Sequence, residues 1–292
     1  MQNRKIFFVS DNLQTINNYR SDLFNFLTAN NFVCKKFPIK NYFLSLAPFK
    51  NDHILIVSNI GSTLSALVLL PFKRKMIILN GLASMKNFKL TRYIFLLLAK
   101  INSSTIFVCQ NFTEYRYLKK YAKNVTHIVC SGGRKFSRNI KESNKFIVIT
   151  RKKKFIRTAE SINNFLKTTK HDLIVYGIDE NYGVIKKEYL HRVQFKGWCE
   201  RSKFFLESGN FFQPYGHNEG FPHSLADAMC SKCNIVIDEN LLIQLGLYRL
   251  KSSNNKFHFF SETEYSEISE ELYFEKICKK YLFQIENFFS LD

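Results

Sequence analysis

The sequence predicts an α/β protein built from two doubly wound domains, in which helices cover both faces of a parallel sheet. Short apolar runs alternate with helical patterns along the chain, and such alternation is typical of parallel sheets. The 292 residues exceed one ordinary core and suit two domains of about 130 to 150 residues each. A hydrophobic content of 46% is sufficient for two cores.

The first half of the chain predicts five strands, each followed by a polar or glycine-bearing turn. They span residues 5–10, 54–58, 76–79, 105–109 and 127–130. Helices are expected between them at residues 16–29, 62–70, 89–100 and 111–121. Asn111 is expected to cap the last of these helices, because Glu114 follows it at the spacing of a capping box. The polar stretch 131–144 is interpreted as a linker.

The second half predicts another alternating set. Strands are expected at residues 146–150, 173–176, 193–196, 211–212 and 235–237, and helices at residues 158–166, 202–207, 224–229 and 271–289. The predicted domains are therefore residues 1–140 and 141–275, with residues 276–292 as a C-terminal helix.

The segment from 210 to 237 holds an acid, a tight turn and a helix start within a few residues. Glu219 follows the apolar strand and precedes the helix, so it lies in a strand-to-helix crevice. Ligands of open α/β sheets bind outside the carboxyl ends of strands, and the free N–H groups of a helix start suit phosphate oxygens. Pro222 stands where a first helical turn tolerates proline.

This segment resembles the Glu-x7-Glu signature of retaining GT-B glycosyltransferases of the family 4, or group 1, type. The matching residues are Glu219, Gly220, Phe221, Pro222, Ala228 and Met229, followed by the apolar strand 235–237. The sequence departs from the family pattern in three places: the second acid is Asp227, the glycine that ends the helix is Lys232, and the proline before the strand is Asn234.

The resemblance implies the GT-B fold, in which two doubly wound, Rossmann-like domains face each other across a cleft and the last helix crosses back to the first domain. It assigns Glu219 to the donor sugar and Asp227 to the ribose of the nucleotide. The donor diphosphate falls to the helix start, formed by Gly220, Phe221, Pro222, His223, Ser224 and Leu225.

Further donor-site candidates follow the other strands of the second domain. The family carries R-x4-K after its first strand, with both cations on the diphosphate; Arg151 matches, but position 156 is Ile. Lys154 or Arg157 would then supply the second charge, which stabilises the departing phosphate. Gly177 ends the next predicted strand, and Gly197 with Trp198 ends a VQFKG run that resembles the family's V-x-F-x-G beside the nucleotide base.

The first domain offers an acceptor side. Ser10, Asp11, Asn80 and Gly81 follow predicted strands. Asn80 and Gly81 precede a basic, apolar stretch at residues 85–98, as in the subset of the family that acts on lipid-linked saccharides.

The net charge of +19 implies a polyanionic partner. Basic residues gather between positions 134 and 157, and again between 73 and 100 around an apolar run. The second group suits a helix lying on an anionic membrane surface, although a buried helix with a solvated basic rim explains it equally well.

The apolar runs are too short to span a bilayer, and no signal peptide is evident. We therefore expect a cytoplasmic protein, with the inner face of the membrane as a site of peripheral attachment. Seven scattered cysteines fit reduced, buried thiols, with Cys230-x-x-Cys233 a weak motif. The sequence lacks D-x-D, phosphate-loop and G-x-G-x-x-G motifs, so we expect neither metal nor cofactor.

The resemblance thus implies a retaining, metal-independent glycosyltransferase. The expected donor is a UDP-hexose or UDP-N-acetylhexosamine, and the expected acceptor a saccharide or lipid-linked saccharide in envelope polysaccharide or glycolipid synthesis. One alternative is a non-catalytic GT-B-like accessory protein. The other, a basic nucleic-acid-binding protein, rests on charge alone, because the aromatic residues near the basic cluster have the spacing of core residues.

Overall fold

The computed structural model describes residues 5–9, 19–37, 53–58, 60–69, 74–79, 89–130, 132–139, 141, 143–216, 220–247 and 257–289. The chain divides into two compact units. The first holds residues 1–132, 219–221 and 274–292, and the second holds residues 133–218 and 222–273. The boundary between residues 132 and 133 lies shortly before the one that the sequence suggests.

The first unit contains a parallel sheet, with six strands among the described residues in the order β2-β1-β3-β4-β5-β6. These are β1 (Lys5–Val9), β2 (Val33–Phe37), β3 (Ile54–Val57), β4 (Lys75–Leu79), β5 (Thr105–Cys109) and β6 (Asn124–His127). The central strands are buried on both faces, as expected for a parallel sheet with helices on each of its two faces.

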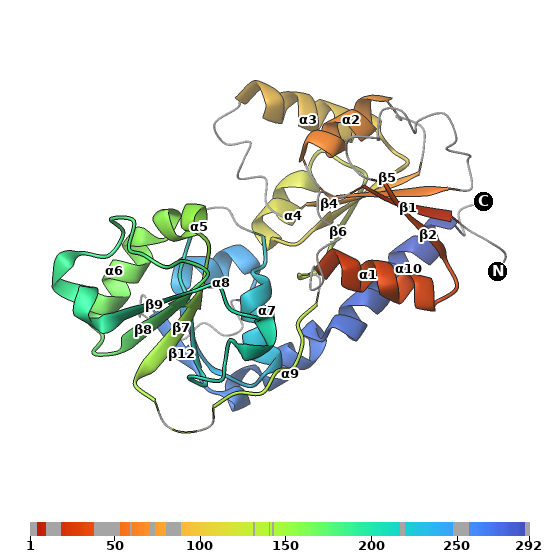
Figure 1. Cartoon of the computed structure of the whole chain (residues 1–292). Helices are drawn as coiled ribbons and strands as arrows, with labels where there is room; N and C mark the ends of the chain where they lie inside the picture. Colours follow the sequence, from red (N-terminus) through yellow and green to blue (C-terminus); the bar gives the residue numbers. More distant parts are fainter. Residues whose placement is uncertain are drawn as a thin grey trace. The chain divides into compact units, whose positions relative to one another are not determined.

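Helices cover both faces of this sheet. They are α1 (Tyr19–Ala29), α2 (Ile60–Leu69), α3 (Lys89–Ile101), α4 (Phe112–Leu118) and α10 (Phe274–Phe289). Figure 1 shows α2 and α3 on one face and α1 with α10 on the other. Tyr281 of α10 is buried and donates its hydroxyl to the carbonyl of Cys130 at 3.4 Å. The last helix is therefore part of the first unit.

The second unit has a sheet in the order β12-β11-β10-β7-β8-β9, in which only β12 is antiparallel among the described strands. The strands are β7 (Lys145–Ile149), β8 (Asp172–Tyr176), β9 (Val193–Gly197), β10 (Asn210–Gln213), β11 (Asn234–Asp238) and β12 (Phe257–Phe260). The helices are α5 (Lys152–Arg157), α6 (Ala159–Thr168), α7 (His223–Cys230), α8 (Glu239–Leu245) and α9 (Glu262–Leu272), with 3-10 turns at Lys187–Arg192 and Arg201–Lys203. The predicted class of two doubly wound α/β domains is thus confirmed.

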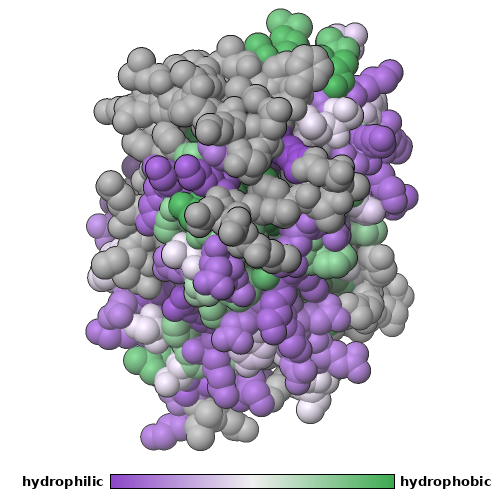
Figure 2. All heavy atoms as spheres, turned by 90° about the vertical axis from the view of Figure 1, so that its right-hand side faces the viewer, coloured by the Kyte–Doolittle hydropathy of each residue, from purple (hydrophilic) through white to green (hydrophobic). Residues whose placement is uncertain are grey.

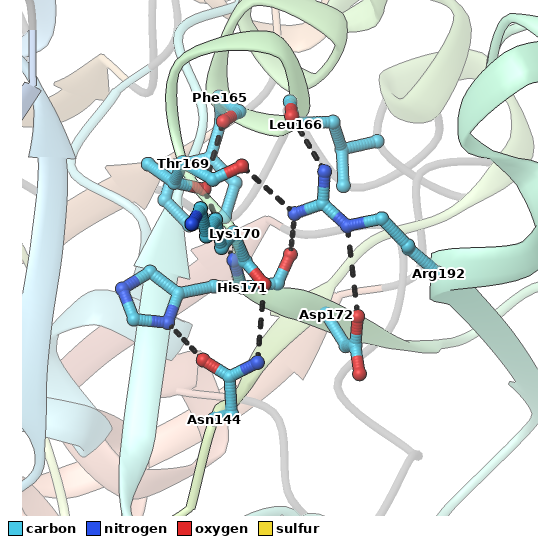
Figure 3. Close-up of polar contacts among 8 residues, drawn as sticks. All are labelled: Asn144, Phe165, Leu166, Thr169, Lys170, His171, Asp172 and Arg192. Atoms are coloured by element: carbon cyan, nitrogen blue, oxygen red, sulfur yellow. Dashed lines mark hydrogen bonds and ion pairs between the residues drawn. The ribbon is translucent and has the colours of Figure 1, made fainter.

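Arg192 fixes the turn between α6 and β8, as Figure 3 shows. Its guanidinium donates to the carbonyls of Leu166 at 2.7 Å, Thr169 at 3.1 Å and His171, and it lies 3.6 Å from the carboxylate of Asp172. The last carbonyls of a helix have no partner within it, so a cation here satisfies them and complements the helix dipole. This contact sets where β8 begins.

Several elements differ from the sequence prediction. The strand expected at residues 127–130 lies at Asn124–His127, and the helix expected at 202–207 is reduced to a 3-10 turn. The helix expected at residues 271–289 corresponds to α10, which begins at Phe274, and Tyr273, whose ψ of 136° is extended, separates it from α9. Strands β2 and β12 and helices α5, α8 and α9 were not anticipated. The cap at Asn111 is confirmed, since its side chain accepts from the N–H groups of Thr113 and Glu114.

Candidate functional site

The strand order reverses in the second sheet between β7 and β10. From β7 the chain proceeds outward through β8 to β9, then returns to β10 on the other side of β7 and proceeds to β11. In doubly wound sheets, ligands bind outside the carboxyl ends of the strands at this switch point. Thr150, Arg151 and α5 follow β7, and residues 214–216 lead from β10 toward α7. Glu219 lies outside the described residues.

The segment after β7 is strongly basic. Arg151 caps α5 in an extended conformation with φ −143° and ψ 156°, and its side chain is exposed. Lys154 is half-buried and Arg157 is exposed, while Phe155 is buried and anchors the helix. The first turn of α5 contains no acidic residue. Positive side chains at the positive end of a helix repel one another and the dipole, so an anion bound there would relieve this repulsion.

The start of α7 differs by one position from the prediction. Pro222 is the residue before the helix, with φ −67° and ψ 125°, and the helix begins at His223. The N–H of Leu225 already donates to the carbonyl of Pro222 at 3.1 Å. By helix geometry, the N–H group of Ser224 has no carbonyl one turn back within the helix. This amide is therefore the better candidate to hold an anion.

Other members of the predicted donor set lie around this helix start. Phe221 and Leu225 are buried, and Gly220 is partly exposed. The hydroxyl of Ser224 donates to Gln213 at 3.4 Å, and Gln213 is the buried last residue of β10. This contact joins the start of α7 to the end of its preceding strand.

Two glycines hold the ends of β8 and β9 together. Gly177 has φ +91° and donates its N–H to the carbonyl of Gly197 at 2.6 Å, and Gly197, at φ +65°, donates to Ile178 at 2.9 Å. A Cβ on Gly177 would lie 2.0 Å from the carbonyl oxygen of Thr150. The backbones at the ends of β7, β8 and β9 therefore lie in direct contact, with no room for a side chain at Gly177. Trp198, which follows Gly197, is 85% exposed.

Asp227 has partners that the sequence did not reveal. Its carboxylate accepts two hydrogen bonds from Arg201, each at 2.7 Å, and one from the backbone N–H of Arg134 at 2.9 Å. The side chain of Asp227 is 2% exposed and that of Arg201 14%. Burial raises the pKa of Asp227 above its ordinary value, and the guanidinium of Arg201 opposes this shift.

Local geometry accounts for the other two departures from the family pattern. Lys232 has φ +63°, so it occupies the left-handed position in which glycine usually ends a helix. Asn234 opens β11, and its N–H donates to the carbonyl of Gly209 at 2.9 Å. A proline at this position would lack that donor. The turn therefore adopts the left-handed geometry that glycine favours although Lys232 occupies it.

The predicted acceptor residues Ser10, Asp11, Asn80 and Gly81 lie outside the described residues. The strands before them are described, however: β1 ends at Val9 and β4 ends at Leu79. In the first sheet the order reverses between β1 and β3, so the chain leaves β1 at the switch point. The described part of the chain holds no cluster of His, Cys, Asp or Glu fit for a metal, and none of its helices has the length and apolar character needed to cross a membrane.

Comparison with known proteins identifies the fold. No family model matches the sequence, and no curated protein sequence matches it. Among solved structures, the chain is similar to the crystal structure of AviGT4, a glycosyltransferase involved in avilamycin A biosynthesis, at 9% sequence identity and a TM-score of 0.61. The match covers 99% of this chain and 98% of that one. The two mostly parallel sheets, each flanked by helices, are those of a GT-B fold.

We expect Gly177→Ala to destabilise the second unit. The left-handed backbone costs an alanine about 1 to 2 kcal/mol, and the clash with Thr150 adds to this loss. Gly183→Ala is the matched control, because Gly183 has φ +72° and a Cβ placed on it would meet no atom within 4 Å. Chemical denaturation of both variants measures the difference, and equal losses of stability would show that the close approach to Thr150 contributes nothing.

We expect Asp227→Ala to lower the free energy of unfolding by about 3 kcal/mol, since it leaves the largely buried Arg201 without its anion. The control is Glu200→Ala, which breaks the exposed pair of Glu200 with Lys203 at 3.5 Å and should leave stability nearly unchanged. Urea titration of the two variants tests this contrast, and a similar small effect in both would contradict it.

Proposed function

We propose that the protein is a glycosyltransferase that moves a sugar from a nucleotide-sugar donor to a hydroxyl group of an acceptor. The observation that carries this proposal is the placement of Arg151 and the start of α7 at the carboxyl ends of β7 and β10. These strands are neighbours and parallel, with Phe211 opposite Ile147, so both features lie at one edge of the sheet. They lie at the switch point of one sheet of a GT-B fold.

The donor diphosphate would be held by this edge. Arg151, with Lys154 or Arg157, supplies positive charge, and the start of α7, with the amide of Ser224, supplies hydrogen-bond donors. The exposed ring of Trp198 offers a flat surface for the nucleotide base beside Gly197. A carboxylate has about four acceptor positions, so the three bonds of Asp227 leave about one for a ribose hydroxyl.

In the proposed reaction no side chain has to act as a general base. The bond between the sugar carbon and the phosphate oxygen breaks as the acceptor oxygen attacks that carbon on the same face. The acceptor proton passes to the departing phosphate oxygen, so configuration is retained. Fixed cations and amides stabilise the charge on the phosphate better than water does, because they need no reorganisation. Glu219 would bind the hydroxyls of the donor sugar, and we propose no metal or cofactor.

The substrates follow from the resemblance to family 4 glycosyltransferases. We propose a UDP-hexose or UDP-N-acetylhexosamine as the donor and a saccharide or lipid-linked saccharide of envelope polysaccharide or glycolipid synthesis as the acceptor. The acceptor would bind near Ser10, Asp11, Asn80 and Gly81, which follow β1 and β4. None of the seven cysteines forms a disulfide, as suits a reducing, cytoplasmic compartment.

A non-catalytic GT-B-like protein is the second candidate. The enclosure of Asp227 by Arg201 and the amide of Arg134 favours it, because a carboxylate that serves the fold has less capacity for a ligand. Hydrolysis of nucleotide sugars separates the two candidates: a non-catalytic protein would bind a donor without turning it over.

We expect Glu219→Ala to reduce kcat about 100-fold to 1,000-fold, the scale of losing a polar contact made to the reacting group. The thermal unfolding of this variant should match that of the wild type. Glu188→Ala removes an exposed acid from the 3-10 turn before β9 and serves as the control. Release of the nucleotide, measured during transfer or donor hydrolysis, tests whether Glu219 contacts the donor sugar. A Glu219→Ala variant with the turnover of the wild type would contradict this role.

We expect Arg151→Ala to weaken the binding of UDP about tenfold or more while leaving uridine binding nearly unchanged, since the guanidinium pairs with phosphate charge. Lys167→Ala is the control for net charge, because Lys167 is exposed in the last turn of α6. Isothermal titration with both ligands gives the comparison. An equal loss for UDP and uridine would place Arg151 away from the diphosphate.

A further inference from the structure

Helix α3 is apolar on two opposite faces. Phe95 and Ala99 are fully buried and pack in the core of the first unit. On the other side, a row of apolar side chains is between 41% and 72% exposed: Leu90, Tyr93, Ile94, Leu97 and Ile101. These residues recur at intervals of three and four, so they form one continuous stripe along the helix, here called the α3 stripe.

An exposed stripe of this kind requires an explanation. Single exposed apolar residues are common on soluble proteins, whereas a contiguous apolar patch marks an interaction surface. Val68 of α2, which packs beside α3, is also 55% exposed. Figure 2 shows apolar atoms at its upper rim, at the height that α2 and α3 occupy in Figure 1.

The sequence on either side of the α3 stripe is basic. Between positions 53 and 130 of the sequence, Glu114 is the single acidic residue, and it is buried. The basic residues of the same stretch are Lys73, Arg74, Lys75, Lys86, Lys89, Arg92, Lys100, Arg116, Lys119, Lys120 and Lys123. Lys75 is buried in β4 and does not contribute to the surface charge. Of the others, Lys100 borders the stripe on α3, whereas Arg92 lies on the side of α3 that meets α4; both are exposed.

Arg92 joins α3 to a second basic surface on α4 and the turn after it. Its guanidinium lies 4.5 Å from the centre of the Tyr117 ring and donates to the hydroxyl of Tyr117 at 3.2 Å. Tyr117 in turn packs against Tyr121 at 5.3 Å between ring centres. The exposed side chains here are Arg116, Lys119, Lys120, Tyr121 and Lys123. Tyrosine, lysine and arginine beside an apolar stripe are the residues typical of the membrane–water interface.

We propose that the α3 stripe docks the first unit on the surface of a bilayer that contains anionic lipid. The apolar side chains enter the boundary between head groups and acyl chains, and the basic residues of α3 and α4 contact the head groups. With 13 residues, α3 is too short to span a bilayer and instead lies in its plane. The proposal does not rest on the proposed activity, because docking requires neither donor nor acceptor.

Charge argues for a membrane over a second copy of this chain. In a symmetric dimer the same patch would face itself, so the basic residues around the α3 stripe would face basic residues without acidic partners. Such like-charge contacts oppose association. An anionic bilayer offers both an apolar phase and negative charge, and therefore matches both features.

Flotation of the full-length protein with vesicles tests the proposal. We expect binding to vesicles of phosphatidylcholine with phosphatidylglycerol at low salt, weak binding to pure phosphatidylcholine, and release of most of the protein at high salt. Leu97→Glu combined with Ile101→Glu should weaken binding at least about tenfold. Lys100→Gln combined with Lys120→Gln should weaken it about fivefold for each charge removed.

Matched variants and a fold control accompany these measurements. Ile243→Glu replaces a 48% exposed apolar residue of α8 in the second unit, and Lys167→Gln removes an exposed charge from α6. Both should bind vesicles as the wild type does. Circular dichroism and thermal unfolding should be the same for all variants, because each substituted side chain is exposed.

Three results would overturn the proposal. The first is a wild-type protein that ignores anionic vesicles at low salt. The second is unchanged binding of the Leu97→Glu, Ile101→Glu variant. The third is a wild-type dimer, detected by sedimentation velocity, that this variant converts to a monomer without any change in vesicle binding. None of these results bears on donor hydrolysis, so the proposed enzymatic function stands or falls separately.

Discussion

The parallel pairing of β10 with β7 is the contact on which the candidate site depends. It places the basic segment after β7 and the start of α7 at the same edge of the sheet. Neighbouring strands lie about 4.8 Å apart, so a β10 placed beyond β9 would be moved two spacings further, or about 10 Å, from β7. One diphosphate could then no longer contact both features. The apolar Phe211 and Ile147 that face each other in this pair thus determine where polar chemistry is possible.

Two further contacts hold this edge rigid. The close approach of Gly177 to Thr150 fixes the ends of β7 and β8 without any side chain between them. The ion pair of Asp227 with Arg201 fixes the second turn of α7 to the segments that contain residues 134 and 201. A buried ion pair adds little net stability, because desolvation offsets the attraction. The Asp227–Arg201 pair instead fixes geometry, since a bidentate ion pair holds α7 in one orientation toward the sheet.

The sequence predicted the repeating α/β order well because apolar periodicity and turn residues are local signals. It failed where the local signal was ambiguous. In β2 the exposed Lys35 and Lys36 interrupt the apolar pattern, and edge strands commonly carry such residues. Helix α5 was missed because its three consecutive lysines hide the apolar pattern, and Phe155 is the one buried residue of this short helix.

For the candidate site, the sequence predicted positions that follow strands. The ends of β7, β8, β9 and β10 could be located because these four strands were predicted, and Lys232 occupies the left-handed turn position that a glycine would mark. The partnership of Arg201 with Asp227 joins residues 26 apart in the chain, and a lone arginine in a loop gives no pattern that identifies its partner. Long-range polar pairs of this kind become visible only when the fold brings them together.

Helix α3 shows why composition alone left two interpretations of its surroundings. A helix that covers a sheet needs one apolar stripe, somewhat more than about 100° wide. The side of α3 that carries Phe95 and Ala99 packs against the sheet, so the second apolar side is not needed to form the core. The two interpretations therefore concern two different sides of one helix. Because water opposes exposure of an apolar stripe while the basic border keeps like surfaces apart, a phase that is both apolar and anionic is the environment that this surface fits.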